Sequence, residues 1–455
     1  MIFRSATKEY YDPETMAQEY LRCYFDNTKI EYPINPFKML KDEGVLFSLN
    51  NFKKLEGVYI PANTKDDIAL VGININRPIT RQRFTAAHEL CHHFKDADKQ
   101  VSCPIGTSKN QTEKFAEQFA AALLMPIDEL QSQVNIRRNE NANISFDDVL
   151  EIACYFGVSF ESCLYRIAYR IHAISGNTEI EELRKRIREY EPDNKRKSKH
   201  ITYANLFASL IDCYQEQLSF SPSDYARYVF QNSYIYNDSR MEGLDVTIEE
   251  ASEIVTDLRL NMQNSKYCNE TNEAYLSIAG HYKMYQDILE FPIKNKLTVY
   301  ELFDLNKSLF SYYPYPEFGG QTRQSNTLVL GAKFETVDYI NIYSELAKVD
   351  EEVKNYYENI KNISMSEYIM HVARVHHRIT QIHPFSEGNG RTSRAFMNIQ
   401  LVRASMLPIY IKVEDKDDYL NALSIADKDG LYDELYEIIF KLILTSYNEL
   451  ILHIE

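Results

Sequence analysis

Long apolar runs, a cysteine framework and an excess of positive charge are all missing from this 455-residue chain. No stretch reaches membrane-spanning length, and residues 1–5 lack the apolar core of a secretory signal, so we expect a cytoplasmic protein with no membrane partner. The seven cysteines are scattered and odd in number, which argues against disulfide pairing and fits a reducing compartment. The net charge of −16 disfavours broad nucleic-acid binding.

The length is too great for one ordinary core, and it predicts two or three domains. An apolar share of 44% with 25% charged residues is typical of a soluble globular protein. We predict a first domain at residues 1–185, a charged linker at 186–200 and a second domain at 201–455.

The densest group of chemically capable side chains lies at residues 383–394, HPFSEGNGRTSR. Apolar and histidine residues recur at three- and four-residue spacing over 369–383, which predicts a helix with His383 on its inward face. Pro384 disfavours helix at the residue before it and should end the element there. A proton acceptor is therefore expected where a helix meets a loop.

That loop has the composition of an anion site. Gly388 and Gly390 allow a tight turn, and a second helix is predicted from about Arg391 to Leu407. Loop amides that lead into a helix N-terminus bind phosphate oxygens. Arg391 and Arg394 lie three residues apart, so both can face one phosphate chain.

The segment resembles the signature of the Fic family (Fic/Doc), in which HPF, any residue, Asp or Glu, GNGR, two residues and Arg follow one another. Every fixed position is matched. The carboxylate of Glu387 suits Mg²⁺. The resemblance implies an AMP transferase with His383 as the base and Arg394 on the outer phosphate. It also implies that the phosphates of ATP are held by Gly388, Asn389, Gly390 and Arg391.

A second feature of the Fic resemblance lies upstream. Many members carry an inhibitory motif of Ser or Thr, three residues, Glu, then Gly or Asn, and Glu242 with Gly243 matches its end. Asp238 stands where Ser or Thr is usual, so the match is partial. The resemblance implies that Glu242 pairs with Arg394 in place of the outer phosphate; the alternative is a plain helix-end glutamate. A hairpin predicted over 319–334 is similar to the flap that aligns target peptides.

The first part of the chain mixes strands and helices. Three strand-like pieces, each bounded by turn residues, are predicted at 44–49, 57–60 and 67–75. They are expected to contribute to a small sheet.

A metal motif follows this sheet. On a helix, His88 and His92 share one face and suit Zn²⁺, with Glu89 placed as a general base; the same HExxH pattern also arises by accident. A third ligand is then required. Glu113 opens a helix in which Ala116 and Ala120 share its face, so Glu113 can approach the histidines.

These features together resemble the ImmA/IrrE family of zinc peptidases, in which the two histidines and the glutamate of the second motif bind zinc. Cys91 stands where glycine is common and is a second candidate ligand. Glu117 replaces the usual asparagine, either beside the ligands or as a surface charge. The resemblance implies an α+β zincin-like domain, with a small sheet and the HExxH helix, ahead of a mainly α-helical Fic domain with a β-hairpin flap.

The two resemblances imply a bifunctional bacterial enzyme of toxin–antitoxin or stress-response type. Its Fic domain would AMPylate a Ser, Thr or Tyr of a target protein, and its peptidase would cleave a regulator such as a repressor or antitoxin. Two alternatives stay open: a metal-stabilised binding module without proteolysis, and deAMPylation or another phosphotransfer at the Fic site. A homodimer is also left open.

Overall fold

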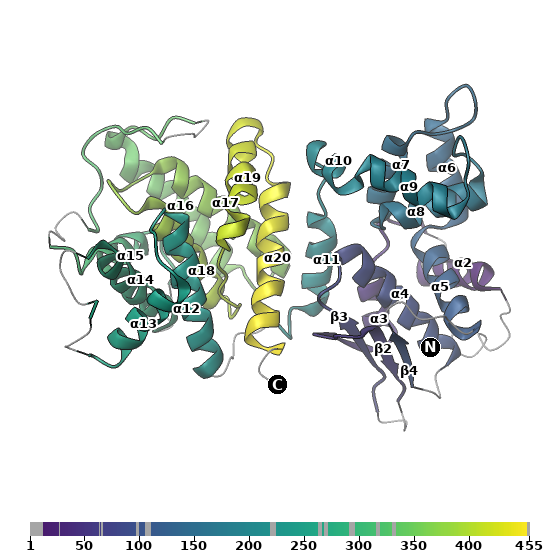
Figure 1. Ribbon diagram of the computed structural model, residues 1–455, viewed down its shortest axis with the longest axis horizontal. Helices are drawn as coiled ribbons and strands as arrows, with labels where there is room; N and C mark the ends of the chain where they lie inside the picture. Colours follow the sequence, from purple (N-terminus) through teal and green to yellow (C-terminus); the bar gives the residue numbers. More distant parts are fainter. Residues whose placement is uncertain are drawn as a thin grey trace. The chain divides into compact units, whose positions relative to one another are not determined.

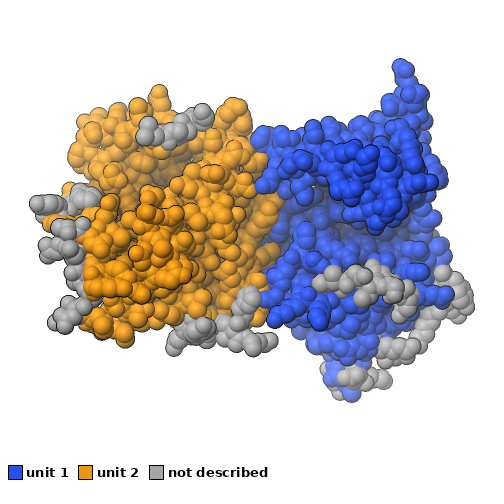
Figure 2. Space-filling view, in the orientation of Figure 1, with its two compact units in different colours: residues 1–214 blue, residues 215–455 orange. Residues whose placement is uncertain are grey.

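The computed structural model describes residues 12–26, 28–62, 64, 67–96, 100–104, 111–218, 224–262, 266–267, 272–290, 296–314, 319–329 and 334–452. The chain divides into two compact units, Met1–Tyr214 and Gln215–Glu455 (Figures 1 and 2). The predicted linker at residues 186–200 and the helix that follows it, Ala204–Tyr214, both fall within the first unit, and the predicted domain boundary stays a prediction.

A four-stranded sheet organises the first unit. Its strands are β1 (Leu46–Asn50), β2 (Leu55–Ile60), β3 (Leu70–Asn74) and β4 (Val101–Pro104), in the order β1-β3-β2-β4. The strand β1 is parallel to β3, whereas β2 is antiparallel to both of its neighbours. The three strands predicted from the sequence are confirmed. The edge strand β4 was not predicted, because it is short and ends in a proline.

The first unit is otherwise helical (Figure 1). The helix α4 (Ile79–Lys95) packs against β2, β3 and α5 (Gln111–Leu124). The other elements are α2 (Pro13–Tyr24), α3 (Pro36–Asp42), α6 (Ile127–Arg137), α7 (Phe146–Phe156), α8 (Phe160–Arg166), the π-helical turn η2 (Ile167–Ile171), α9 (Ile180–Tyr190), α10 (Pro192–Ser198) and α11 (Ala204–Tyr214).

One arginine fixes the position of α4. The guanidinium of Arg83 is fully buried and donates to the carbonyls of Ile34 and Gly157, at 2.6 and 3.0 Å. Burial lowers its pKa to about 9. Because these acceptors end other segments, Arg83 ties α4 to the C-terminus of α7 and to the loop before α3.

The second unit is built from helices (Figure 1). Its elements are α12 (Asp224–Met241), α13 (Ile248–Arg259), α14 (Glu273–Glu290), α15 (Glu301–Phe310), η4 (Tyr339–Asn341), α16 (Ile342–Glu358), α17 (Met365–Ile382), α18 (Asn389–Arg403), η5 (Val413–Asp415), α19 (Lys416–Asp429) and α20 (Asp433–Leu450). The helix α18 is buried along most of its length and packs against α14, α15 and α17.

The second helix of the 383–394 region ends earlier than predicted. It stops at Arg403, not at Leu407, because Ser405 adopts a left-handed conformation with φ of 59°. The amides of Ser405 and Met406 then bond to the carbonyls of Val402 and Leu401, which is a Schellman ending.

The predicted flap is only partly described, because residues 330–333 lie outside the described ranges. Within residues 319–329, Thr322 forms an isolated antiparallel bridge with Phe385. The hydroxyl of Thr336 also donates to the carbonyl of Thr327 at 2.6 Å, so the two arms of the segment approach each other. Among the described helices, none combines the length and apolar character that a membrane span requires.

Candidate metal centre and nucleotide site

Four metal-ligand side chains meet in the first unit. His88 and His92 come from α4, Glu113 from α5 and Cys103 from β4, and one donor atom of each lies within 4.8 Å of every other. The Nε2 atoms of the two histidines are 3.0 Å apart, and Glu113 lies 3.3 Å from His88 and 3.5 Å from His92. All four are buried. The structure therefore brings the three predicted ligands together.

The buried surroundings of this cluster fit a cation. Burial raises the pKa of Glu113, but contacts with His88 and Cys103 outweigh it and hold the value at about 2. The Nδ1 atom of His92 lies 2.8 Å from the carboxylate of Asp96, a partner that leaves Nε2 facing the centre. Two imidazoles, a carboxylate and a thiol are all donors that Zn²⁺ accepts.

The predicted base lies beside these ligands. Glu89 is fully buried, and neither carboxylate oxygen has a hydrogen-bond partner among the described residues. Burial raises the pKa of Glu89 well above its usual range, and the charge of Glu113 adds to the rise, although the neighbouring thiol of Cys103 acts in the opposite sense. A β-carbon at Gly57 would lie 2.5 Å from Glu89 Oε1, so glycine lets β2 approach the helix here. A buried carboxylate without a partner is costly and marks a site built for a ligand.

Sequence reasoning missed one member of the cluster. Cys103 lies 2.8 Å from His88 Nε2 and 3.1 Å from Glu113. Cys91, the second candidate ligand, is buried on α4 and does not belong to the cluster found among the described residues. The only sequence signal for Cys103 was its place between the two metal motifs.

In the second unit, His383 ends α17 in a left-handed conformation with φ of 52°. Arg323 holds this turn. Its Nε donates to the carbonyl of His383 at 2.7 Å, and its backbone amide donates to Pro384 at 2.9 Å. The side chain of Arg323 is buried and also donates to the carbonyl of Val337. Sequence reasoning missed this arginine, whose partners are backbone groups far along the chain.

The loop after His383 is fixed from inside. The amide of Asn389 accepts from the backbone NH of Phe385 at 2.9 Å and donates to its carbonyl at 2.8 Å. Gly388 precedes α18 with φ of 78°. Asn306 on α15 donates to the carbonyl of Glu387 at 3.0 Å. The side chain of Asn389 therefore shapes the loop, and its predicted contact with nucleotide would use its backbone.

Polar groups surround the N-terminus of α18. The Nε atom of Arg391 is buried and has no hydrogen-bond partner among the described residues. Glu387, the predicted magnesium ligand, is exposed four residues earlier in the chain. A β-carbon at Gly390 would lie 2.8 Å from Glu242 Oε1 and 3.0 Å from Arg394. Helix amides, a free guanidinium edge and an exposed carboxylate fit a phosphate chain with its cation.

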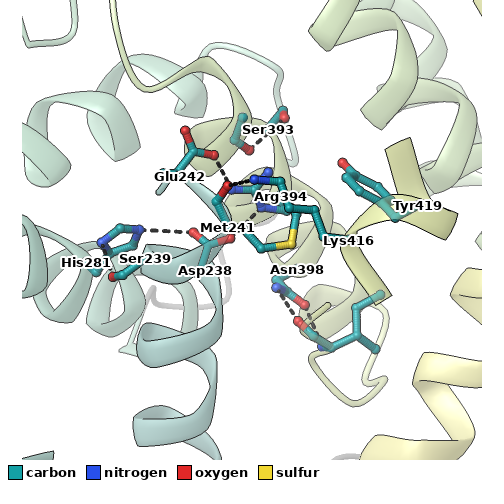
Figure 3. Close-up of polar contacts among 12 residues, drawn as sticks. Asp238, Ser239, Met241, Glu242, His281, Ser393, Arg394, Asn398, Lys416 and Tyr419 are labelled. Atoms are coloured by element: carbon teal, nitrogen blue, oxygen red, sulfur yellow. Dashed lines mark hydrogen bonds and ion pairs between the residues drawn. The ribbon is translucent and has the colours of Figure 1, made fainter. Parts of the chain in front are cut away.

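Arg394 is held by two carboxylates (Figure 3). Its NH2 donates to Glu242 at 2.7 Å, and its Nε donates to the buried Asp238. His281 lies on the other side of Asp238, with Nε2 3.0 Å from Oδ2. Burial raises the pKa of Asp238, but Arg394 and His281 outweigh it and hold the value at about 2. Asp238, which we had treated as a departure from the motif, is thus an ion-pair partner.

The end of α12 that carries Glu242 is anchored by the segment before α19 and by its first residue. Lys416 donates to the carbonyl of Met241 at 2.7 Å, and the amide of Val413 donates to Asn237 at 3.0 Å. About a third of the Glu242 side chain, 34%, remains exposed. The carboxylate therefore lies at the solvent edge of a fixed helix end, where a ligand can compete with it.

The first unit carries a buried group of side chains that could hold a metal ion, and the second, helical unit carries a glycine loop that leads into α18. Family models agree: residues 44–168 match the IrrE N-terminal-like domain, and residues 296–401 match the Fic/DOC family. The chain therefore joins an IrrE N-terminal-like domain to a Fic domain in a mainly helical unit.

Curated relatives match only in part. The protein adenylyltransferase Fic of Aedes aegypti is 27% identical over 138 residues, 30% of this chain and 26% of that protein. The protein of the same name from Drosophila erecta is 26% identical over 199 residues, 44% of this chain and 37% of its own length. The chain thus spans about a third of these relatives. A solved structure of Fic-1 from C. elegans is 16% identical, with a TM-score of 0.46, and covers 81% of this chain and 97% of that one.

Proposed function

We propose that the second unit transfers AMP from ATP to a Ser, Thr or Tyr hydroxyl of a target protein. The observation that carries this proposal is the placement of a histidine, His383, at the start of a glycine loop that leads into α18, the helix that carries Arg391 and Arg394. The relatives named as adenylyltransferases support the same chemistry.

The chain's own groups have distinct tasks in this reaction. His383 takes the proton of the target hydroxyl, whose oxygen bonds to the α-phosphorus while the bond to the bridging oxygen of pyrophosphate breaks. The loop amides and Arg391 hold phosphate oxygens. Glu387 is the group that would hold Mg²⁺, which neutralises phosphate charge. Arg394 binds the outer phosphate when Glu242 releases it.

The test is label transfer from ATP by the full chain. Protein extracts are incubated with ATP labelled at the α- or the γ-phosphate, and protein-bound label is counted. AMP transfer predicts α-label on protein and no γ-label. Transfer of γ-label alone would replace AMP transfer by phosphotransfer, and loss of AMP from a pre-labelled target would favour the deAMPylation alternative.

We also propose that the first unit is a zinc-dependent peptidase that cleaves a regulatory protein, such as a repressor or antitoxin. Support comes from His88, His92 and Glu113 around one point, with the unpaired carboxylate of Glu89 beside them. Zinc would supply Lewis acidity there, and Glu89 would accept the proton of the attacking water. The second candidate, a metal-stabilised binding module, is favoured by the fourth donor, Cys103.

Metal content and proteolysis separate these two candidates. Purified full chain should hold one zinc, and loss of target cleavage on Glu89→Gln with zinc retained would support the peptidase. His88→Ala should lose the metal. If both variants process every tested regulator as the parent does, the peptidase proposal fails.

The acid limb of AMP transfer should lie below pH 6.5, the ordinary pKa of histidine. Burial lowers the pKa of His383, and the charge of Arg323 adds to this, although Thr380 and Glu242 act in the opposite sense. A lowered pKa keeps the imidazole unprotonated to more acidic pH, so activity is lost only as pH falls through the lowered value. The rate of label transfer between pH 5 and 8 checks this, and a half-point above about 6.5 would contradict it.

Arg323→Lys should lower AMP transfer by about tenfold or more while leaving ATP affinity within about threefold, because a misplaced catalytic group costs rate first. Lysine keeps the charge but not the several donors that hold the carbonyls of His383 and Val337. The measurement is kcat for label transfer beside nucleotide binding by calorimetry. Equal loss of both would show that Arg323 supports the whole loop and does not act mainly on His383.

A further inference from the structure

The metal cluster of the first unit has one more protein donor than a hydrolytic zinc site uses. Catalytic zinc sites keep three protein ligands and one open position, whereas structural sites are closed by four. Here His88, His92 and Glu113 already supply three donors, and the thiol of Cys103 lies 2.8 Å from one of them and 3.1 Å from another. All four are buried.

The sheet explains how Cys103 reaches this point. In the ladder between β2 and β4, Cys103 is paired with Gly57, and paired residues project to the same face. Gly57 faces α4 at Glu89 and Thr85, where a β-carbon would lie 2.5 Å from either side chain. Cys103 is buried, whereas its neighbours Ser102 and Pro104 are exposed. The strand therefore directs the sulfur toward the turn of α4 that contains Thr85 and Glu89.

Resting on the zinc site proposed above, we propose that Cys103 is a fourth protein ligand of this metal and occupies the position that peptide hydrolysis must keep open. Thiolate is a preferred ligand of zinc. With Cys103 bound, the metal would have no open position, and Glu89 would have no metal-bound water to deprotonate until the sulfur leaves. Cys103 is carried by β4, a four-residue edge strand and the shortest strand of the sheet.

Cobalt substitution tests the ligand set directly. The full chain is loaded with one Co²⁺, and its near-ultraviolet and visible absorption is recorded for the parent, Cys103→Ala, Cys103→Ser and the control Cys91→Ala. We expect a thiolate-to-cobalt charge-transfer band in the parent and in Cys91→Ala, and no such band in either Cys103 variant. Cys91 is a matched control because it is also buried, yet it lies outside the cluster.

A small chelating anion then reports the open position. Acetohydroxamate should change the cobalt spectrum of Cys103→Ala and leave that of the parent unchanged. Zinc affinity should fall by at least about tenfold in this variant, because even partners one step beyond the ligands are worth that much. A parent protein that binds one cobalt without the thiolate band, or that accepts acetohydroxamate as readily as the variant, would overturn the proposal.

Proteolysis is a separate readout. If the peptidase proposal is right, Cys103→Ala should cleave its regulator faster than the parent. A thiolate band with no cleavage by either protein would remove the peptidase and keep Cys103 as the closing ligand of a binding module. Cleavage by a parent that lacks the band would keep the peptidase and remove Cys103.

Discussion

Replacing Glu242 by glycine should raise AMP transfer by about tenfold. A hydrogen bond to a charged group contributes about 1.5–3 kcal/mol, and a partly exposed pair falls at the low end of that range. Every 1.4 kcal/mol corresponds to a factor of about ten. Glu242 is one-third exposed and accepts from NH2 of Arg394 at 2.7 Å. Its removal therefore frees that NH2 group to bind phosphate.

The matched comparison is Asp238→Asn in the same motif. Asp238 is buried and also faces His281, so its loss leaves the buried Arg394 and His281 without their shared carboxylate and should lower transfer rather than raise it. Initial rates with α-labelled ATP would be measured for the parent and both variants, with nucleotide affinity beside them. A gain in both variants, or in neither, would mean that Glu242 does not hold the site back.

The largest loss is expected at His383. His383→Ala should reduce AMP transfer by about 100- to 10,000-fold, the range that a positioned general base contributes. The imidazole ends α17, where Arg323 fixes the backbone, and no other histidine lies in the segment from 383 to 394. The measurement is single-turnover label transfer, with ATP binding followed separately and expected to change little.

His371→Phe is the matched control for this loss. His371 lies on the same helix and stacks on Tyr356 with ring centroids 3.7 Å apart, and phenylalanine keeps an aromatic ring there. Its transfer rate should stay within about threefold of the parent. Equal losses in both variants would assign the effect to α17 as a whole, and full activity in His383→Ala would remove the base.

Local patterns were enough to predict the helices and motifs that carry most of the two sites. The fixed spacing of HExxH placed His88 and His92 on one face of α4, and Gly388 marked the loop before α18, in whose first turn Gly390 lies. These features depend on neighbours within one or two helical turns. Three strands of the sheet were also predicted from local sequence, because turn residues bound each of them.

The residues that were missed act over long stretches of chain. Cys103 joins the cluster only because β4 pairs with β2, and Asp238 is an ion-pair partner only because the fold brings the last turn of α12 to Arg394 on α18. Arg323 donates to carbonyls about sixty residues away, which no local spacing encodes. A short edge strand that ends in proline, and polar groups whose partners are backbone atoms, leave little trace in a single sequence.

The two carboxylates that bond to Arg394 have different roles: one orients the guanidinium, and the other can leave and free it for phosphate. Asp238 accepts from the Nε of Arg394 within the core, so the arginine stays oriented when Glu242 leaves its NH2 group. The strength of the inhibition can therefore change at Glu242, which lies at the solvent edge, while the residues that bind phosphate stay the same. A single substitution at Glu242, or a partner that binds the end of α12, would therefore change the rate of AMP transfer without changing the positions of the other catalytic groups.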